Sequence, residues 1–105
     1  MEMTNVKLIN ADNTLGGLAQ QKVNGTLAFK LYRLKQQLEQ LVTPVRQTLE
    51  DIGYEDQQAP EFQEVLQITQ EFEPVEKLQS SELENLDLSL TQIAFIADFI
   101  DSQEE

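Results

Sequence analysis

Carboxylates are the most frequent side chains in this sequence that could do chemistry. The 105 residues include 19 Asp and Glu, eight of them between positions 61 and 87: Glu61, Glu64, Glu71, Glu73, Glu76, Glu82, Glu84 and Asp87. Paired carboxylates can act as general acid and base, or bind a hard cation. Segment 51–56, however, lacks the alternating oxygen ligands and closing glutamate of an EF-hand. We therefore predict no catalytic, metal-binding or cofactor-binding residue, and interpret the acids as a solvated face or one complementary to a basic protein.

The sequence contains neither histidine nor cysteine. This removes thiolate nucleophiles, disulfides, zinc sites built from these residues, and the one side chain that normally titrates near neutral pH. The segment Leu15-Gly16-Gly17-Leu18 lacks the lysine and the spacing of a phosphate-binding loop. We therefore expect a protein that is not an enzyme. An enzyme or a small-ligand carrier stays open as a third class, because it would need a pocket that the sequence alone does not reveal.

The net charge of −12 is unevenly distributed along the chain. Residues 1–53 hold six of the seven Lys and Arg against five acids, a net charge of +1, whereas residues 54–105 hold one lysine against fourteen acids, a net charge of −13. An acidic half of this kind repels a phosphate backbone, so we expect no direct binding to nucleic acid. Basic proteins are the favoured partners. Whether the basic half contacts the acidic half of its own chain or of a neighbour stays open.

Size and composition indicate one domain, residues 1–105, in which 102–105 form a frayed tail. A chain of 12.0 kDa with 40% hydrophobic residues can build one small core. No basic stretch followed by an apolar stretch occurs near the first residue, and no run of about 18 apolar residues occurs anywhere. We therefore expect an intracellular protein without a signal peptide or membrane contact.

A long helix over residues 25–52 is the strongest local feature. Apolar residues recur at alternating spacings of four and three: Leu27, Leu31, Leu34, Leu38, Leu41 and Val45. This spacing is a heptad pattern, interpreted here as a buried stripe in preference to a coiled-coil surface, with self-association left open. Asn24 or Thr26 would cap the start, Pro44 would kink the helix, and Gly53 would end it.

The remaining elements are shorter. The alternation in residues 5–9 predicts a strand that pairs with an extended segment at 71–78, forming a two-stranded ribbon, and a brief helix follows at about 11–21. Proline at position 60 opens a helix over about 60–69, and a capping box at Ser89 opens a terminal helix over about 90–101. The predicted fold is α+β and mainly α-helical, with the long helix packed on the terminal helix and the ribbon at one edge.

The terminal helix carries the candidate binding site. Its apolar residues cover nearly the whole circumference, so one face is expected to remain for a partner. We assign partner binding to Phe95, Ile96, Phe99 and Ile100, with Glu73 and Glu76 among the acids that tune partner choice. The aromatic residues Phe29 and Tyr32, beside lysine and arginine in the long helix, are interpreted as core or boundary residues and not as base-stacking groups.

Several segments carry a resemblance to a protein family. They are Val6-Lys7-Leu8, Leu27-Ala28-Phe29-Lys30-Leu31-Tyr32-Arg33-Leu34-Lys35, Phe72-Glu73-Pro74-Val75 and Leu86-Asp87-Leu88-Ser89-Leu90-Thr91-Gln92-Ile93. In this arrangement the chain resembles small uncharacterised bacteriophage or prophage proteins, which have a short N-terminal strand, an A-x-K-L-x-K-L helix and a D-L-x-x-L-x-L-S-P-x-x-L finish. The resemblance implies a viral or prophage origin, a non-enzymatic role, and a location in the host cytoplasm or the virion. It carries over no site residue.

Together these patterns predict a non-enzymatic protein-binding module, a phage or prophage assembly or structural accessory protein. Its partner would be a second copy in a homo-oligomer, a virion component or a host protein. The alternative is an acidic phage-encoded inhibitor that uses the −13 half to mimic nucleic acid and occupy a groove on a host defence or transcription protein.

Overall fold

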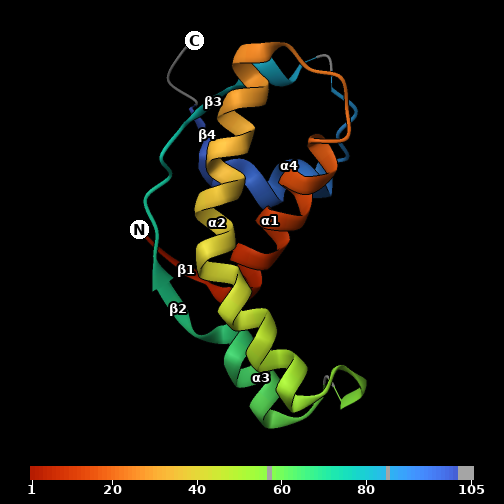
Figure 1. The fold of residues 1–105 in the computed structure, drawn as a ribbon, viewed down its shortest axis with the longest axis vertical. Helices are drawn as coiled ribbons and strands as arrows, with labels where there is room; N and C mark the ends of the chain where they lie inside the picture. The colour runs from red at the N-terminus through yellow and green to blue at the C-terminus, as the bar shows by residue number, and fades with distance from the viewer. Residues whose placement is uncertain (57, 85, 102–105) are drawn as a thin grey trace.

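The structure is a computed structural model that describes residues 1–56, 58–84 and 86–101 (Figure 1). Its described part contains four α-helices: α1 Asn5–Leu18, α2 Gly25–Ile52, α3 Pro60–Gln67 and α4 Leu90–Ile96. Short strands pair twice, β1 Glu2–Thr4 antiparallel to β2 Thr69–Glu71 and β3 Leu78–Gln79 parallel to β4 Ile100–Asp101. The predicted α+β, mainly helical class is confirmed.

Helix α2 has the bounds that its sequence predicts, 25–52. The Asn24 side chain accepts a hydrogen bond from the Leu27 N–H at 2.9 Å and caps the first turn. At the other end Gly53 adopts a φ of 109°, a conformation that favours glycine. Pro44 lies inside α2, which continues past it, and the Thr48 hydroxyl donates to the Pro44 carbonyl at 2.9 Å. Local capping and patterning are therefore sufficient to define this helix.

The apolar stripe of α2 is buried inside the molecule, as the favoured interpretation predicts. Its buried residues are Leu27, Leu31, Leu34, Leu38, Val42, Val45 and Leu49, whereas Leu41 is half-buried. Helix α1 packs against this stripe with its own buried set, Leu8, Ala11, Leu15 and Leu18, again at spacings of three and four. The pair α1 and α2 is thus the framework on which the other elements pack.

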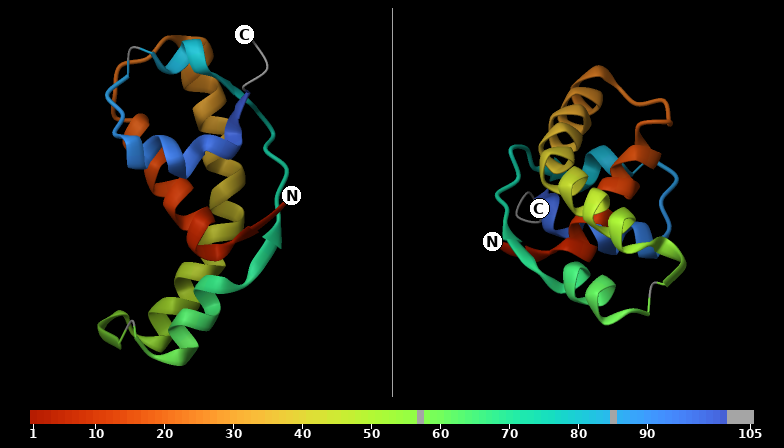
Figure 2. Two further views of the ribbon diagram at one scale, coloured as in Figure 1. Left: turned by 180° about the vertical axis from the view of Figure 1, so that it is seen from behind. Right: turned by 60° about the horizontal axis from the view of Figure 1, so that its bottom comes forward.

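The expected packing of the long helix directly on the terminal helix needs correction. Helix α4 lies mainly against α1, and Figure 2 shows it crossing α1 when the molecule is viewed from behind. The buried Ile96 and Phe99 reach the core that α2 also lines, and the half-buried Leu88 and Ile100 pack against it. The prediction was wrong because it treated α1 as a brief element; as a full helix of 14 residues, α1 takes the place beside α2.

The ribbon exists, but not where the sequence placed it. Residues 5–9 are not a strand: they are the start of α1, whose first turn is capped by Thr4, the side chain of which accepts from the Lys7 N–H at 3.3 Å. The strand is the segment before it, and Thr4 pairs with Thr69 in β2. Within the predicted 71–78 segment, only the ends belong to strands, because Pro74 cannot donate a backbone hydrogen bond.

The terminal helix is shorter than the predicted 90–101. The capping box is confirmed, since the Gln92 N–H donates to the Ser89 hydroxyl at 3.1 Å and the Ser89 N–H donates to the Gln92 side chain at 2.9 Å. After Ile96 the chain tightens into a 3₁₀ turn at Ala97–Phe99 and then extends as β4. Pairing of β4 with the distant β3 replaces further helix. The predicted frayed tail at 102–105 lies outside the described residues.

Helix α3 and the last turns of α2 form a second, smaller packing unit at the lower end of Figure 1. Pro60 occupies the first turn of α3, as predicted, although the helix ends at Gln67 and not at about 69. Phe62 is buried against Val45 and Leu49. This extension makes the molecule elongated, with extents of 42 × 26 × 24 Å.

Acids of the second half pair with cations of the first half within the same chain. We call residues 71–84 the acidic strap. Lys30 lies 3.0 Å from Glu82, and Arg33 lies 2.6 Å from Glu76. The N-terminal ammonium lies 2.7 Å from both Glu71 and Glu73. The strap is therefore held along α2 partly by charge. In this structure the basic half thus contacts the acidic half of its own chain.

A buried carboxylate joins α1 to α2. The Asp12 side chain is 1% exposed; its Oδ2 accepts a hydrogen bond from Arg46 at 2.8 Å, and its Oδ1 lies 3.0 Å from the Lys35 ammonium in an ion pair without hydrogen-bond geometry. Lys35 also lies 3.1 Å from Glu39. We call Asp12, Lys35 and Arg46 the Asp12 cluster. Partial burial lowers the pKa of Lys35, but the neighbouring Asp12 and Glu39 outweigh this effect and raise it overall.

Replacing Asp12 by asparagine should lower the free energy of unfolding by about 1–3 kcal/mol. The loss stays below that of a fully buried pair because Lys35 and Arg46 are 30% and 36% exposed and can regain water. Urea unfolding followed by circular dichroism measures it. The exposed Asp51→Asn should stay within about 0.5 kcal/mol of the parent, and equal effects of the two substitutions would contradict the role of the Asp12 cluster.

The Lys30–Glu82 pair should make stability depend on pH. Partial burial raises the pKa of Glu82, but the Gln79 N–H and the Lys30 ammonium together lower it below its ordinary 4.5. Because its pKa is lower in the folded state, the Glu82 carboxylate adds to the free energy of unfolding above pH 4.5. This contribution is lost as the pH falls through the folded-state pKa. Glu82→Gln keeps an acceptor for Gln79 but removes the charge, so its deficit in unfolding free energy should shrink in acid. A difference in unfolding free energy between Glu82→Gln and the parent that is constant with pH would refute this. The exposed Glu64→Gln is the control.

Candidate partner-binding surface

Helix α4 presents an apolar face to solvent. We define the α4 outer face as the exposed residues Leu90, Thr91, Ile93, Ala94, Phe95 and Ala97. Leu90 is 85% exposed, the largest value among the exposed large hydrophobic residues in the described part of the chain. Ile93 and Phe95 are 39% and 37% exposed. Because residues 88–97 include no charged side chain, this face is a continuous uncharged surface on an otherwise acidic protein.

The structure separates the four predicted apolar site residues. Phe95 lies on the α4 outer face, whereas Ile96 and Phe99 are fully buried and Ile100 is half-buried in β4. The Phe99 ring packs 5.5 Å from the Phe72 ring, centroid to centroid. Phe99 follows Ile96 by three residues and is buried with it in the main core, within the 3₁₀ turn that follows α4. Leu90 and Ile93 take their place at the surface, and their exposure was not assigned from the sequence.

The two predicted glutamates lie on the acidic strap. Glu73 is exposed, and the N-terminal ammonium lowers its pKa by hydrogen bonding and by charge. The same contact, together with Glu71, raises the pKa of the N-terminal ammonium. Glu76 is half-buried and pairs with Arg33. Both side chains are therefore engaged within the chain, and neither lines the cleft beside Phe95.

A cleft of about 290 Å³ adjoins the α4 outer face. Met3, Lys7 and Asn10 line one side, and Phe95 and Asp98 line the other. Lys7 is exposed and makes no ion pair with any residue in the described ranges. A side chain inserted here would contact the Phe95 ring and meet one positive and one negative group.

Acidic side chains flank α4 along the chain. Glu84 and Asp87 precede the helix and Asp98 follows it, and all three are exposed. An apolar centre with a charged rim is the arrangement found in many protein interfaces. Burying one exposed phenylalanine or leucine contributes about 1.5–3 kcal/mol. The arrangement can therefore bind a macromolecule without any covalent chemistry.

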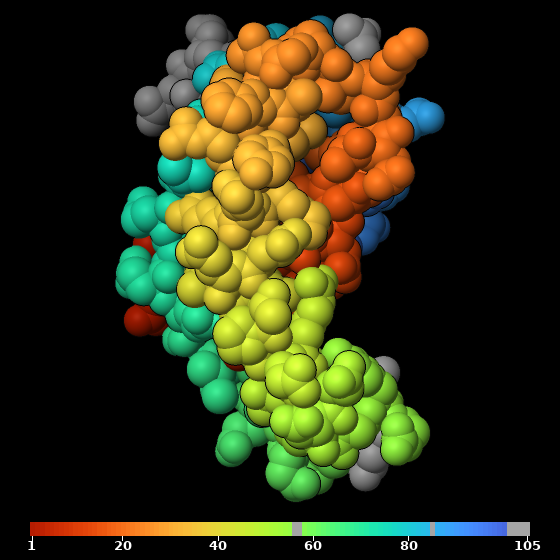
Figure 3. Space-filling view, in the orientation of Figure 1, coloured from red at the N-terminus to blue at the C-terminus, as the bar shows by residue number. Residues whose placement is uncertain are grey.

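A second hollow, lined by Ala19, Ala28 and Tyr32 among others, lies between α1 and α2, the two helices in view in Figure 3, where α4 is largely hidden. Beside it on α2, Phe29 and Tyr32 are 62% and 58% exposed, so their interpretation as core or boundary residues was wrong. Phe29 and Tyr32 are two and five residues after Leu27, which turns both side chains away from the buried stripe of α2. This outward position could have been read from the heptad pattern, because Leu27 and Leu31 already define the inner face.

The described residues include neither a metal-ligand cluster nor a membrane-spanning helix. No group of three or more potential metal ligands lies close enough together to hold an ion. No helix among them combines the length and apolarity needed to cross a bilayer.

Comparison of the chain with protein-family models, with curated proteins and with solved structures found no match.

The different environments of the two phenylalanines should be measurable. Phe99→Ala removes a fully buried ring and should lower the free energy of unfolding by about 3–5 kcal/mol. Phe95→Ala should cost about 1 kcal/mol or less because the ring is 37% exposed. Urea unfolding of both variants tests the assignment. A larger loss of unfolding free energy for Phe95→Ala than for Phe99→Ala would contradict the assignment of Phe99 as buried and Phe95 as exposed.

Proposed function

We propose that this protein is a non-catalytic protein-binding module and that its partner docks on the α4 outer face and the adjoining cleft. The observation that carries the proposal is the uncharged segment 88–97, whose residues on the α4 outer face are exposed, on a chain of net charge −12. Net charge favours solubility, whereas exposed leucine and phenylalanine do not. A contiguous apolar patch with a polar rim is typical of an interaction site.

The charges around α4 define the kind of partner. The partner would offer an apolar groove for Leu90 and Phe95, with basic residues positioned to meet Glu84, Asp87 and Asp98. Rim charges of this kind mainly accelerate association and select the partner, whereas burial of the apolar centre supplies most of the affinity. The long-range acidic field of the second half would repel anionic competitors such as nucleic acid.

The resemblance to small bacteriophage proteins makes the biological setting more specific. In this proposal the protein is a phage or prophage assembly or structural accessory factor, and its partner is a virion component or a host protein. It would act in the host cytoplasm or in the virion.

A second candidate function has one observation in its favour. The end of the molecule formed by α2 and α3 contains no Lys or Arg between residues 47 and 64, and exposes five carboxylates: Glu50, Asp51, Glu55, Glu61 and Glu64. An acidic inhibitor that mimics nucleic acid would use this end. Against this candidate, the strap belongs to the acidic half, and several of its acids are already paired with cations of the same chain.

Site-specific crosslinking tests the α4 proposal. A photoreactive amino acid replaces Thr91, on the α4 outer face, or Thr43, an exposed residue of α2, in cells of the natural host carrying the phage or prophage. We expect a discrete adduct from position 91 and none from position 43. Mass spectrometry identifies the partner, which is then purified for affinity measurements.

With the purified partner, Leu90→Ser with Phe95→Ser should weaken the dissociation constant by at least about tenfold. The matched control, Ile68→Ser with Val75→Ser, removes two exposed apolar side chains elsewhere and should leave affinity unchanged. Raising salt from about 0.05 to 0.5 M should reduce affinity only slightly, whereas an acidic mimic would lose most of it. Equal adducts from both positions, or unchanged binding by the double variant, would disprove docking on α4.

A further inference from the structure

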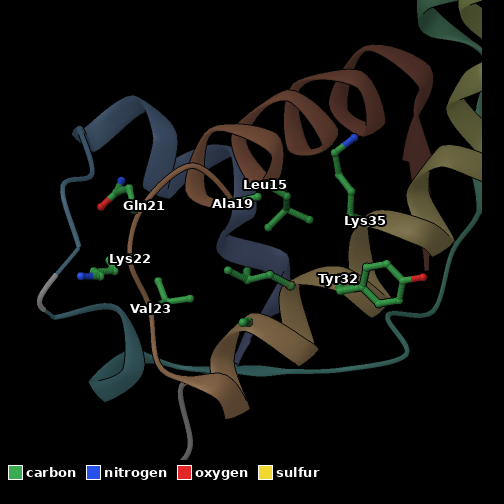
Figure 4. Close-up of a pocket in the computed structure, with 9 residues that line it drawn as sticks. Leu15, Ala19, Gln21, Lys22, Val23, Tyr32 and Lys35 are labelled. Carbon is green, nitrogen blue, oxygen red and sulfur yellow. The ribbon is translucent and has the colours of Figure 1, made fainter.

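A groove of about 450 Å³ lies between the end of α1, the connecting residues 19–24 and the first turns of α2 (Figure 4). Its apolar surface is formed by Leu15, Ala19, Val23, Ala28 and Leu31. Leu15 and Leu31 are 1% and 3% exposed and form a firm floor, because both belong to the main core. The volume falls within the range of small-molecule sites, roughly 300–1,000 Å³.

Two alanines are the reason that the groove is open. Ala19 and Ala28 are exposed and stand on opposite walls, one after α1 and one in the first turns of α2. Their small side chains leave the space above the two buried leucines empty, and the alanine side chains are themselves in contact with water. A ligand with an apolar body would therefore bury surface that the chain itself leaves in contact with water.

The charges of the groove indicate an anionic ligand. Figure 4 shows Lys22 on the connecting-residue side and Lys35, next to Tyr32, on the α2 side. The Lys35 ammonium is already compensated by Asp12 and Glu39. Lys22 is exposed and makes no ion pair within ranges 1–56, 58–84 and 86–101, and exposed lysine side chains change rotamer within nanoseconds. Figure 4 shows the Lys22 nitrogen turned outward, and a change of rotamer brings this uncompensated positive charge to the edge of the groove.

We propose that this groove binds a small amphipathic monocarboxylate, with the aliphatic body over Leu15 and Leu31 and the carboxylate at Lys22. None of the lining residues belongs to α4, so the site is independent of the proposed docking surface. The proposal places a small-ligand function on a protein whose sequence indicates only macromolecular binding.

Decanoate is a suitable probe, and decanol is its uncharged counterpart. A ¹⁵N-labelled sample is titrated with each, and amide chemical shifts locate the site. We expect saturable changes at Ala19, Val23 and Ala28 with a dissociation constant of about 1 mM or tighter for decanoate. Decanol should bind at the same residues but more weakly.

Three variants separate the apolar and charged contributions. Ala28→Leu fills the groove from an exposed position and should weaken both probes by at least about tenfold, with the thermal melting curve as a check on folding. Lys22→Gln should weaken decanoate about two- to fivefold and leave decanol unchanged. Lys7→Gln, at the cleft beside Phe95, should change neither.

Two outcomes would overturn the proposal. One is the absence of saturable shifts at the groove up to about 10 mM decanoate, an order of magnitude above the expected constant. The other is binding that persists unchanged in Ala28→Leu, which would place the probe elsewhere, for example at the cleft beside Phe95.

Discussion

The buried carboxylate of Asp12 sets the position of α1 along α2, and the other elements depend on that position. Lys35 and Arg46 reach Asp12 from places eleven residues apart on α2, about three helical turns. Leucine stripes with heptad spacing can pack in more than one register, because a displacement by seven residues restores a similar pattern. Such a displacement would separate Asp12 from both cations and leave a charge buried without compensation, which is strongly unfavourable.

Both concave surfaces follow from this register. Leu15 lies one turn after Asp12 and forms the floor of the groove, and Lys35 belongs both to the Asp12 cluster and to the groove wall. On the other side of the molecule, α4 lies on α1, so the α4 outer face and the cleft beside Phe95 take their orientation from the same helix. One ion-pair cluster thus orients two surfaces that face different ways.

Because charges pair within the chain, fewer acids are available to a partner than the composition suggests. By composition alone, the second half is a polyanion that should seek a basic partner. In the fold, Glu71 and Glu73 instead pair with the N-terminal ammonium, whereas Glu76 and Glu82 pair with cations of α2 and hold the strap along that helix. Within the described part of the second half, the other exposed acids lie around α4 and at the end formed by α2 and α3. Selection of a partner by charge would therefore act at these places and not along the whole half.

Much of the fold could be predicted because the deciding signals are local. Helix α2 has an N-cap, a heptad pattern and a terminating glycine within its own residues, and α4 has a complete capping box. Residues 5–9 could not be assigned correctly from their own alternation, because Leu8, Ala11, Leu15 and Leu18 also fit a helix. Packing against α2 decides between the two patterns, and it outweighs the cost of the glycine pair inside α1.

The sequence by itself determined the helical class, the bounds of α2, the start of α4, and the excess of apolar residues in the terminal segment. Only tertiary structure decided which of those residues are exposed, because β4 pairs with a strand about twenty residues earlier and draws Phe99 inward. It also decided that strap acids would meet α2 cations and that a groove would open beside Ala28. These outcomes depend on contacts between residues far apart in the chain, and no local pattern encodes such contacts.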